Sequence, residues 1–246
     1  MSGHSHYATI KRQKGLQDAA RGRIFSKLTR GIHIAVKSGG GSDPASNYKL
    51  RMAIELARVA NMPKENIDRA INAAAKANEN LEEVTYEGFG PGGIGVIVEA
   101  ATNNRNRTGQ ELKNMMEKVG GSMAGPGAVA FNFDPKGLIL VAKDTNPEDQ
   151  MLKLIDLGVE DIQETDDAIE VYVAPENLSS VREKLTGSGF EVRSAELVKK
   201  AKNFNLIEEA AAAKKVLDFL DNLEDHDDVQ KVYTNVDIPE QVLSQI

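Results

Sequence analysis

The residues of this chain whose types and spacing could do chemistry are mostly cationic and lie near its start. Between residues 23 and 37 the apolar side chains recur at the period of an amphipathic helix, and the basic side chains fall on the opposite side. Such a helix can pack with one face and bind phosphates with the other, because each phosphate contact releases counterions. An ordinary solvated basic face would give the same pattern, although Asp18 is the only acid in the first 30 residues. The candidate contacts of this basic stripe, with the first residue as a platform for base stacking, are Tyr7, Lys11, Arg12, Lys14, Arg21, Arg23, Lys27, Arg30 and Lys37.

A second group of hydrogen-bond donors occupies residues 102–108, between a predicted strand and a predicted helix. Arg105 and Arg107 stand there among three asparagines and two threonines, a composition suited to phosphate or sugar contacts. An equally good interpretation is structural, with the asparagines making turns and Thr108 capping the helix. Both interpretations stay open at this point.

Residues 86–95 are rich in glycine, and Gly88, Gly90 and Gly93 match the pattern G-x-G-x-x-G. In a dinucleotide site that loop follows a strand and opens a helix whose N-terminus meets the pyrophosphate. Here a strand follows instead, Pro91 interrupts the loop, and no Lys-Ser/Thr pair comes after it. We therefore predict a tight turn that leads into a strand, and no nucleotide cofactor.

Other side chains give no sign of catalysis or of a metal site. The chain has no cysteine, which excludes disulfides, thiolate nucleophiles and sulfur-ligated metals. The histidines are too few and too scattered in sequence to predict a metal centre: they are His4, His6, His33 and His226. Acidic clusters lie in predicted turns and helix ends, where we expect solvated charge and no acid–base pair: residues 160–161, 164–167 and 224–228. We predict a non-enzymatic protein without catalytic residues, metal, cofactor or small-molecule substrate.

Charge is strongly segregated along the chain. Residues 1–76 carry 14 Lys and Arg against 5 Asp and Glu, whereas the remainder carries 16 against 32. This asymmetry indicates a polyanion-binding end and a solubilising end. No apolar run is long enough for a membrane helix and no secretory signal opens the chain. A cytoplasmic protein whose partner is nucleic acid is the expectation, with no membrane partner.

Helices are predicted for the first third of the chain. One covers residues 23–37 and stops at the glycines 39–41, and a second covers residues 47–60. A third follows, with Asn61 as its N-cap and Pro63 in its first turn. Together they predict a small helical bundle that ends in a linker at residues 77–80.

Strands and helices alternate in the remainder. A strand at 94–100, a helix at 110–119 and a strand at 129–133 precede a complete βαββαβ series between about residues 136 and 200, which is the ferredoxin-like order. A helix at 206–223 and a strand at 229–236 could complete the earlier sheet. The predicted fold class is α/β (α+β) with three domains. They are a helical domain of residues 1–78, a discontinuous α/β middle domain of residues 79–135 and 203–246, and an inserted ferredoxin-like domain of residues 136–202.

Several motifs together resemble the YebC family, which includes the mitochondrial translational activator of cytochrome c oxidase subunit one. GHSHYATIK at residues 3–11 is similar to the family's GHSKWANIK, and QDAARGRIFSKL at residues 17–28 is similar to QDAKRGKIFTKL. Further matching segments are residues 61–68, 86–93, 103–108 and 227–235. Departures fall on the expected contact surface, because His6 and Tyr7 stand where the family has Lys-Trp and Ala20 replaces a lysine.

The resemblance implies a three-domain α/β protein with no known catalytic residues. Family members are described as DNA-binding transcriptional regulators in bacteria and as translation factors acting at the ribosome. We therefore expect a nucleic-acid-binding regulator of gene expression, of the DNA-binding transcriptional kind. The alternative is a translational activator that binds ribosomal or transfer RNA. The basic stripe is poor in Asn and Gln, so it favours backbone and shape recognition over base readout.

Overall fold

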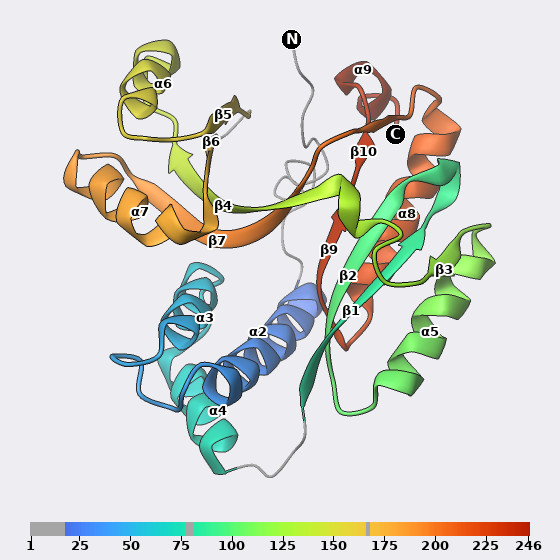
Figure 1. Cartoon of the computed structure of the whole chain (residues 1–246), viewed down its shortest axis with the longest axis horizontal. Helices are drawn as coiled ribbons and strands as arrows, with labels where there is room; N and C mark the ends of the chain where they lie inside the picture. Colours follow the sequence, from blue (N-terminus) through green and yellow to red (C-terminus); the bar gives the residue numbers. More distant parts are fainter. Residues whose placement is uncertain (1–17, 77–80, 166–167) are drawn as a thin grey trace. The chain divides into compact units, whose positions relative to one another are not determined.

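The computed structural model describes residues 18–76, 81–165 and 168–246 of the chain. It contains two compact units (Figure 1): residues 133–200 form one, and the segments before and after them form the other. The predicted fold class, a mixture of helices and sheets, is confirmed. The further division of the larger unit into a helical domain and a discontinuous α/β domain stays a prediction.

Three helices open the larger unit, as the apolar periodicity predicts. They are α2 (Asp18–Ser38), α3 (Tyr48–Val59) and α4 (Lys64–Lys76). Their apolar faces bury one cluster between them, because each helix alone would leave its stripe in water. The buried members are Ile32, Ala35, Val36, Leu50, Ile54, Ala57, Met62, Ile67, Ala70 and Ala74.

The chain turns between α2 and α3 around the buried side chain of Asn47. The amide oxygen of Asn47 accepts the N–H of Leu50 at 3.0 Å and caps α3, while its amide nitrogen donates to the carbonyls of Ala35 and Gly41, each at 2.7 Å. A Cβ on residue 39 would lie 2.1 Å from the Asn47 oxygen. The predicted glycine stop is confirmed, and Gly39 is required because the asparagine amide fills the space beside it.

Asn61 ends α3, and the prediction that it caps the next helix is wrong. Its φ is 57°, in the left-handed region that asparagine tolerates better than most residues. The N–H of Asn61 donates to the carbonyl of Arg58 and that of Met62 to the carbonyl of Ala57, each at 2.9 Å. This pair of bonds is a Schellman motif, which satisfies the last carbonyls of a helix.

An antiparallel four-stranded sheet with the order β3-β1-β2-β9 forms the rest of the larger unit. Its strands are β1 (Glu82–Phe89), β2 (Gly95–Thr102), β3 (Ser122–Ala124) and β9 (Val229–Thr234). Helices α5 (Arg105–Lys118) and α8 (Ala210–Asp225) share one core with the sheet (Figure 1). Val96 and Val98 of β2 belong to this core together with Met116 of α5 and Phe219 of α8. The pairing of β9 with β2 confirms that the C-terminal strand completes the sheet.

Short elements connect these parts. They are the 3-10 turns η1 (Pro91–Gly93) and η2 (Ala130–Asn132), the parallel pair β8 (Asn205–Leu206) and β10 (Val236–Asp237), and helix α9 (Glu240–Leu243). The predicted strand at residues 129–133 is wrong, because η2 occupies this segment. Strand β1 was not predicted, since it exposes Glu82, Glu83 and Thr85 and buries Glu87, so its apolar alternation is weak.

The chain leaves the larger unit after Asn132 and rejoins it before Asn203, and these two asparagines are hydrogen-bonded to each other. The side-chain nitrogen of Asn132 donates to the carbonyl of Asn203 at 2.8 Å, and the backbone N–H of Asn203 donates to the Asn132 side-chain oxygen at 3.0 Å. The N–H of Lys202 also donates to the Asn132 carbonyl at 2.8 Å. These bonds fix the two ends of the inserted segment next to each other.

The inserted unit has the predicted series of elements. Its strands are β4 (Phe133–Ala142), β5 (Asp161–Glu164), β6 (Ala168–Val173) and β7 (Val192–Ala201), and its helices are α6 (Pro147–Ile155) and α7 (Leu178–Gly187), the latter preceded by η3 (Pro175–Asn177). The sheet order is β5-β6-β4-β7. Every residue of β6 is buried, which one covered face alone would not give, because successive side chains point to opposite faces of the sheet.

Candidate nucleic-acid interface

The predicted phosphate contacts fall into three groups in the structure. Tyr7, Lys11, Arg12 and Lys14 lie outside the described residues. Arg21 and Arg23 belong to α2, with side chains outside the described set. The side chains that are described belong to Lys27, Arg30, Lys37, Arg105 and Arg107.

Two residues of the basic stripe contact the turn between α8 and β9. The ammonium of Lys27 donates to the carbonyl of Glu224. A guanidinium nitrogen of Arg30 donates to the carbonyl of Asp227 and to the carboxylate of Asp228, both at 2.5 Å. The middle of α2 is thus hydrogen-bonded to the acidic segment 224–228, while Lys37 is exposed in the last turn of the helix.

Asp228 joins the two basic groups that are far apart in sequence. Its Oδ1 pairs with Arg30, and its Oδ2 accepts from the guanidinium of Arg107 and the hydroxyl of Thr108, each at 2.7 Å. The Thr108 hydroxyl also lies 2.8 Å from that of Thr102, and because its single proton goes to Asp228, Thr108 accepts this second hydrogen bond. We call Arg30, Arg107, Thr108 and Asp228 the Asp228 junction. It connects α2, the first turn of α5 and the start of β9.

The charge at the centre of this junction is stabilised by its partners. The Asp228 side chain is only 7% exposed, whereas those of Arg30 and Arg107 are 33% and 47% exposed. Burial alone would raise the pKa of the Asp228 carboxyl, but hydrogen bonds from Thr108, Arg107 and Arg30 lower it below its ordinary value. Asp228 is therefore ionised at neutral pH, with both oxygens bound to donors.

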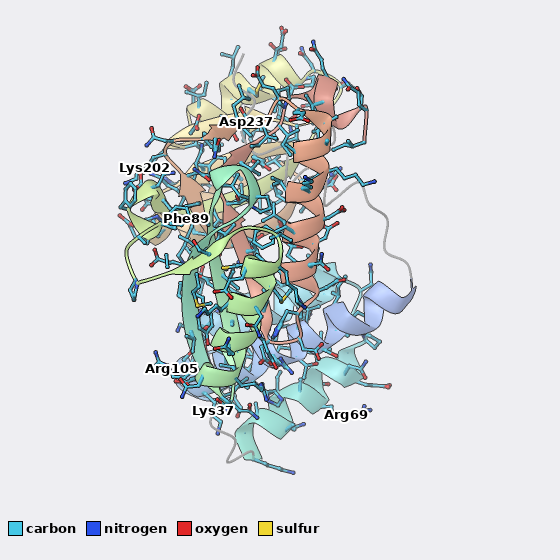
Figure 2. All side chains as sticks on the ribbon, turned by 90° about the vertical axis from the view of Figure 1, so that its right-hand side faces the viewer. Lys37, Arg69, Phe89, Arg105, Lys202 and Asp237 are labelled. Carbon is cyan, nitrogen blue, oxygen red and sulfur yellow. The ribbon has the colours of Figure 1, made fainter. Side chains whose placement is uncertain are left out.

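The N-terminus of α5 is capped by Asn104. The Asn104 side chain accepts the N–H of Arg107 at 3.1 Å, so the predicted capping role of Thr108 is wrong. Arg105, at the start of α5 (Figure 2), has an exposed side chain, and its backbone carbonyl accepts a 2.6 Å hydrogen bond from the hydroxyl of Tyr86. Within residues 18–76, 81–165 and 168–246 the guanidinium of Arg105 has no hydrogen-bond or ion-pair partner.

Glu111, His226 and Asp228 stand close enough to resemble a metal triad. Their ligand atoms lie within 4.8 Å of one another. Nδ1 of His226 accepts the N–H of Asp228 at 3.1 Å, which leaves Nε2 to donate to Glu111 at 3.0 Å. Both ring nitrogens are therefore used, and Asp228 already carries two guanidinium partners. The donor set fits a hydrogen-bond network and does not fit a divalent cation, which would meet repulsion from Arg30 and Arg107.

The glycine-rich segment 86–95 has a structural role in this region. Gly92 and Gly93 have φ of 73° and 75° in the turn that leads into β2, as predicted. The carboxylate of Glu87 is buried and accepts the N–H groups of Gly127, Val129 and Ala130 at 2.7, 2.7 and 2.8 Å. Burial raises the pKa of Glu87, but these three hydrogen bonds lower it further than burial raises it. The segment thus anchors the loop before η2.

Comparison with known proteins decides the family. The TACO1/YebC protein N-terminal domain matches residues 5–77, and the TACO1/YebC second and third domain matches residues 81–236. The chain belongs to the YebC family.

Relatives of this YebC-family chain match it from end to end. A probable transcriptional regulatory protein of Dictyoglomus turgidum is 45% identical over 250 residues, which cover 100% of both chains. Another from Sulfurihydrogenibium sp. is 46% identical and covers 100% of this chain and 99% of the relative. The crystal structure of a conserved hypothetical protein from Aquifex aeolicus superposes with a TM-score of 0.88 at 42% identity, over 97% of this chain and 99% of that one. The names of the curated relatives indicate a family of regulatory proteins.

Asp228 is the residue of this YebC chain that sequence reasoning missed. Residues 224–228 were expected to carry solvated charge, and for Asp228 this is wrong, because its carboxylate is buried and bound. The available signal was its position directly before strand β9, within the family motif at residues 227–235. A carboxylate buried at the entry to a strand needs hydrogen-bond or ion-pair partners.

Proposed function

We propose that this chain is a non-enzymatic, DNA-binding transcriptional regulatory protein of the cytoplasm. The observation that carries the proposal is the positive charge of the helical segment, where residues 18–76 hold 11 Lys and Arg against 5 Asp and Glu. The names of the curated relatives support the regulatory role. In the described ranges, no helix is both long and apolar enough to cross a membrane.

The proposed division of labour follows three domains. Residues 1–78 bind nucleic acid, residues 79–135 with 203–246 form the α/β middle domain, and residues 136–202 form the inserted domain. The phosphate contacts proposed here are those of the basic stripe together with Arg105 and Arg107. Arg105 and Lys37 are exposed on the larger unit, whereas Arg30 and Arg107 are paired with Asp228.

The test compares two triple variants of the full chain that each remove three positive charges. The first variant neutralises N-terminal residues of the basic stripe and carries Lys11→Gln, Arg12→Gln and Lys14→Gln. The control neutralises exposed lysines outside the helical segment and carries Lys113→Gln, Lys118→Gln and Lys153→Gln. Binding of fluorescent duplex DNA and of single-stranded RNA is measured by anisotropy over a series of salt concentrations. The N-terminal variant should lower the salt slope by about one per lost phosphate contact, and the control should leave the slope unchanged. Equal slopes for both variants would refute the proposed contact surface.

A cell lysate fractionated on a sucrose gradient separates the two kinds of regulator. Absence from ribosomal fractions, with footprints on promoter DNA, supports the transcriptional role. Salt-sensitive migration with ribosomes would instead assign the chain to translation.

A further inference from the structure

The Asp228 junction holds cations that belong to the proposed nucleic-acid interface. A guanidinium donates hydrogen bonds to carboxylate and to phosphate oxygens alike. Asp228 uses one oxygen for Arg30 and the other for Arg107, which a phosphodiester with two free oxygens could also do. A phosphate between these two side chains could therefore make the contacts that the Asp228 carboxylate makes.

The exposure of the junction makes such an exchange accessible. The guanidinium side chains of Arg30 and Arg107 are 33% and 47% exposed, so an anion from outside can reach both. Segment 224–228 also carries four acids, which repel a polyanion from the same face. While the junction is closed, it removes two cations from the binding surface and adds negative charge beside them.

The parts joined at the junction have separate apolar cores. The cluster between α2, α3 and α4 and the cluster between the sheet, α5 and α8 share no residue. Lys27 and Arg30 donate side-chain hydrogen bonds that link α2 to the last turn of α8 and to the segment that follows it. Ile34 of α2 is also buried and belongs to neither cluster, and α2 lies against β2 and β9. Opening the junction would expose this small contact but would leave both clusters intact, so the helices can move from the sheet as a body.

We propose that the Asp228 junction is an autoinhibitory contact in which Asp228 mimics a phosphate, and that the phosphates of nucleic acid displace it. This inference rests on the proposed function for the identity of the displacing ligand. A closed state lowers apparent affinity by the fraction of molecules that are open. Release of Arg30 and Arg107 then couples binding to separation of α2 from the start of β9.

The chain suits a direct measurement because it has no cysteine. Spin labels are attached through Val59→Cys at the end of α3 and Val119→Cys after α5, at residues that are 57% and 42% exposed. The distance between the labels is measured in the full chain, free and with a 20-base-pair DNA duplex or a 20-nucleotide RNA. The free chain should give one distance, and either ligand that binds should add a longer one.

Two variants separate masking from simple loss of structure. Asp228→Asn should show the longer distance without nucleic acid and should bind roughly fivefold tighter or more, the lower end of common coupling effects. Arg30→Gln should also show the longer distance but bind no tighter, because it opens the contact and removes a cation. Thermal unfolding of each variant confirms that it is folded, and Arg30→Gln decides the distance test if Asp228→Asn does not fold.

The outcomes distinguish this inference from the proposed function. If the unchanged chain binds nucleic acid but folded Asp228→Asn keeps both affinity and label distance, the autoinhibitory contact is refuted. If the unchanged chain binds neither the DNA duplex nor the RNA, the proposed function fails. The label distance in Asp228→Asn, measured without nucleic acid, then still shows whether Asp228 holds α2 against the start of β9.

Discussion

Replacement of Glu87 by glutamine tests how the glycine-rich segment holds the loop before η2. The carboxylate accepts three backbone N–H groups, from Gly127, Val129 and Ala130, over 2.7 to 2.8 Å. Glutamine has the same shape, but its single oxygen can accept only two of them, and its NH2 group would face the third. One charge-assisted hydrogen bond, worth about 1.5–3 kcal/mol, is lost, and the part-buried N–H of Gly127 is left facing the NH2 group. We expect a destabilisation of about 3 kcal/mol, a large part of the roughly 5–15 kcal/mol that holds an ordinary protein folded.

Hydrogen exchange measures this loss where it occurs. If the loop opens locally, a cost of about 3 kcal/mol speeds exchange of the amides of Gly127, Val129 and Ala130 by about 100-fold. Glu83→Gln is the matched control, because Glu83 is exposed on the same strand. Unchanged exchange in Glu87→Gln, or an equal change in Glu83→Gln, would refute the anchoring role.

The same substitution also changes the response to acid. The pKa of Glu87 is lowered in the folded chain, so its contribution is present above the unfolded value of about 4.3 and is lost as pH falls through the folded pKa. Chemical unfolding followed between neutral pH and pH 3 should therefore show a smaller acid-induced loss of stability in Glu87→Gln than in the unchanged chain. An identical loss in both would contradict this origin of acid sensitivity.

Two further substitutions test contacts that position the helices. Gly39→Ala should destabilise the protein by more than 2 kcal/mol, because its Cβ would lie 2.1 Å from the Asn47 oxygen. Gly22→Ala has no atom within 4 Å of its Cβ and should stabilise α2 by up to about 1 kcal/mol. Thermal unfolding of both variants measures the difference, and equal effects would argue against crowding at residue 39. Thr108→Val should cost about 1–3 kcal/mol because the buried Asp228 oxygen loses a donor, and a melting temperature within error of the unchanged chain would show that Arg107 alone satisfies this oxygen.

Local periodicity predicts the parts of this fold in which one element has one apolar face. The helices of the first third and the βαββαβ series of the insertion follow from spacing that a single sequence displays. Strand β1 escapes prediction because its buried acid, Glu87, looks like a surface residue. The predicted strand at 129–133 is wrong because of the same residue. Glu87 accepts the N–H groups of Val129 and Ala130, which in a strand would bond to a neighbouring strand.

The candidate interface shows where the limit of sequence reasoning lies. The types of residue in the basic stripe and at Arg105 and Arg107 are visible in the sequence, and so is their suitability for phosphate. That Arg30 and Arg107 meet at Asp228 depends on pairs separated by 198 and 121 positions. Helical spacing carries no information about such distances along the chain, so the meeting point is known only from the folded arrangement.

The mutual hydrogen bonds of Asn132 and Asn203 have a consequence for how this architecture could have arisen. Hydrogen bonds within the larger unit hold the two ends of the 133–200 unit together. For the larger unit, the whole insertion therefore connects two neighbouring points of the chain, as a short turn would. The entropy of closing a loop grows only slowly with its length, so a segment of another size or fold could occupy this place at little cost. A protein that acquired an extra domain here would have kept its original fold. The same site also allows one inserted domain to be exchanged for another.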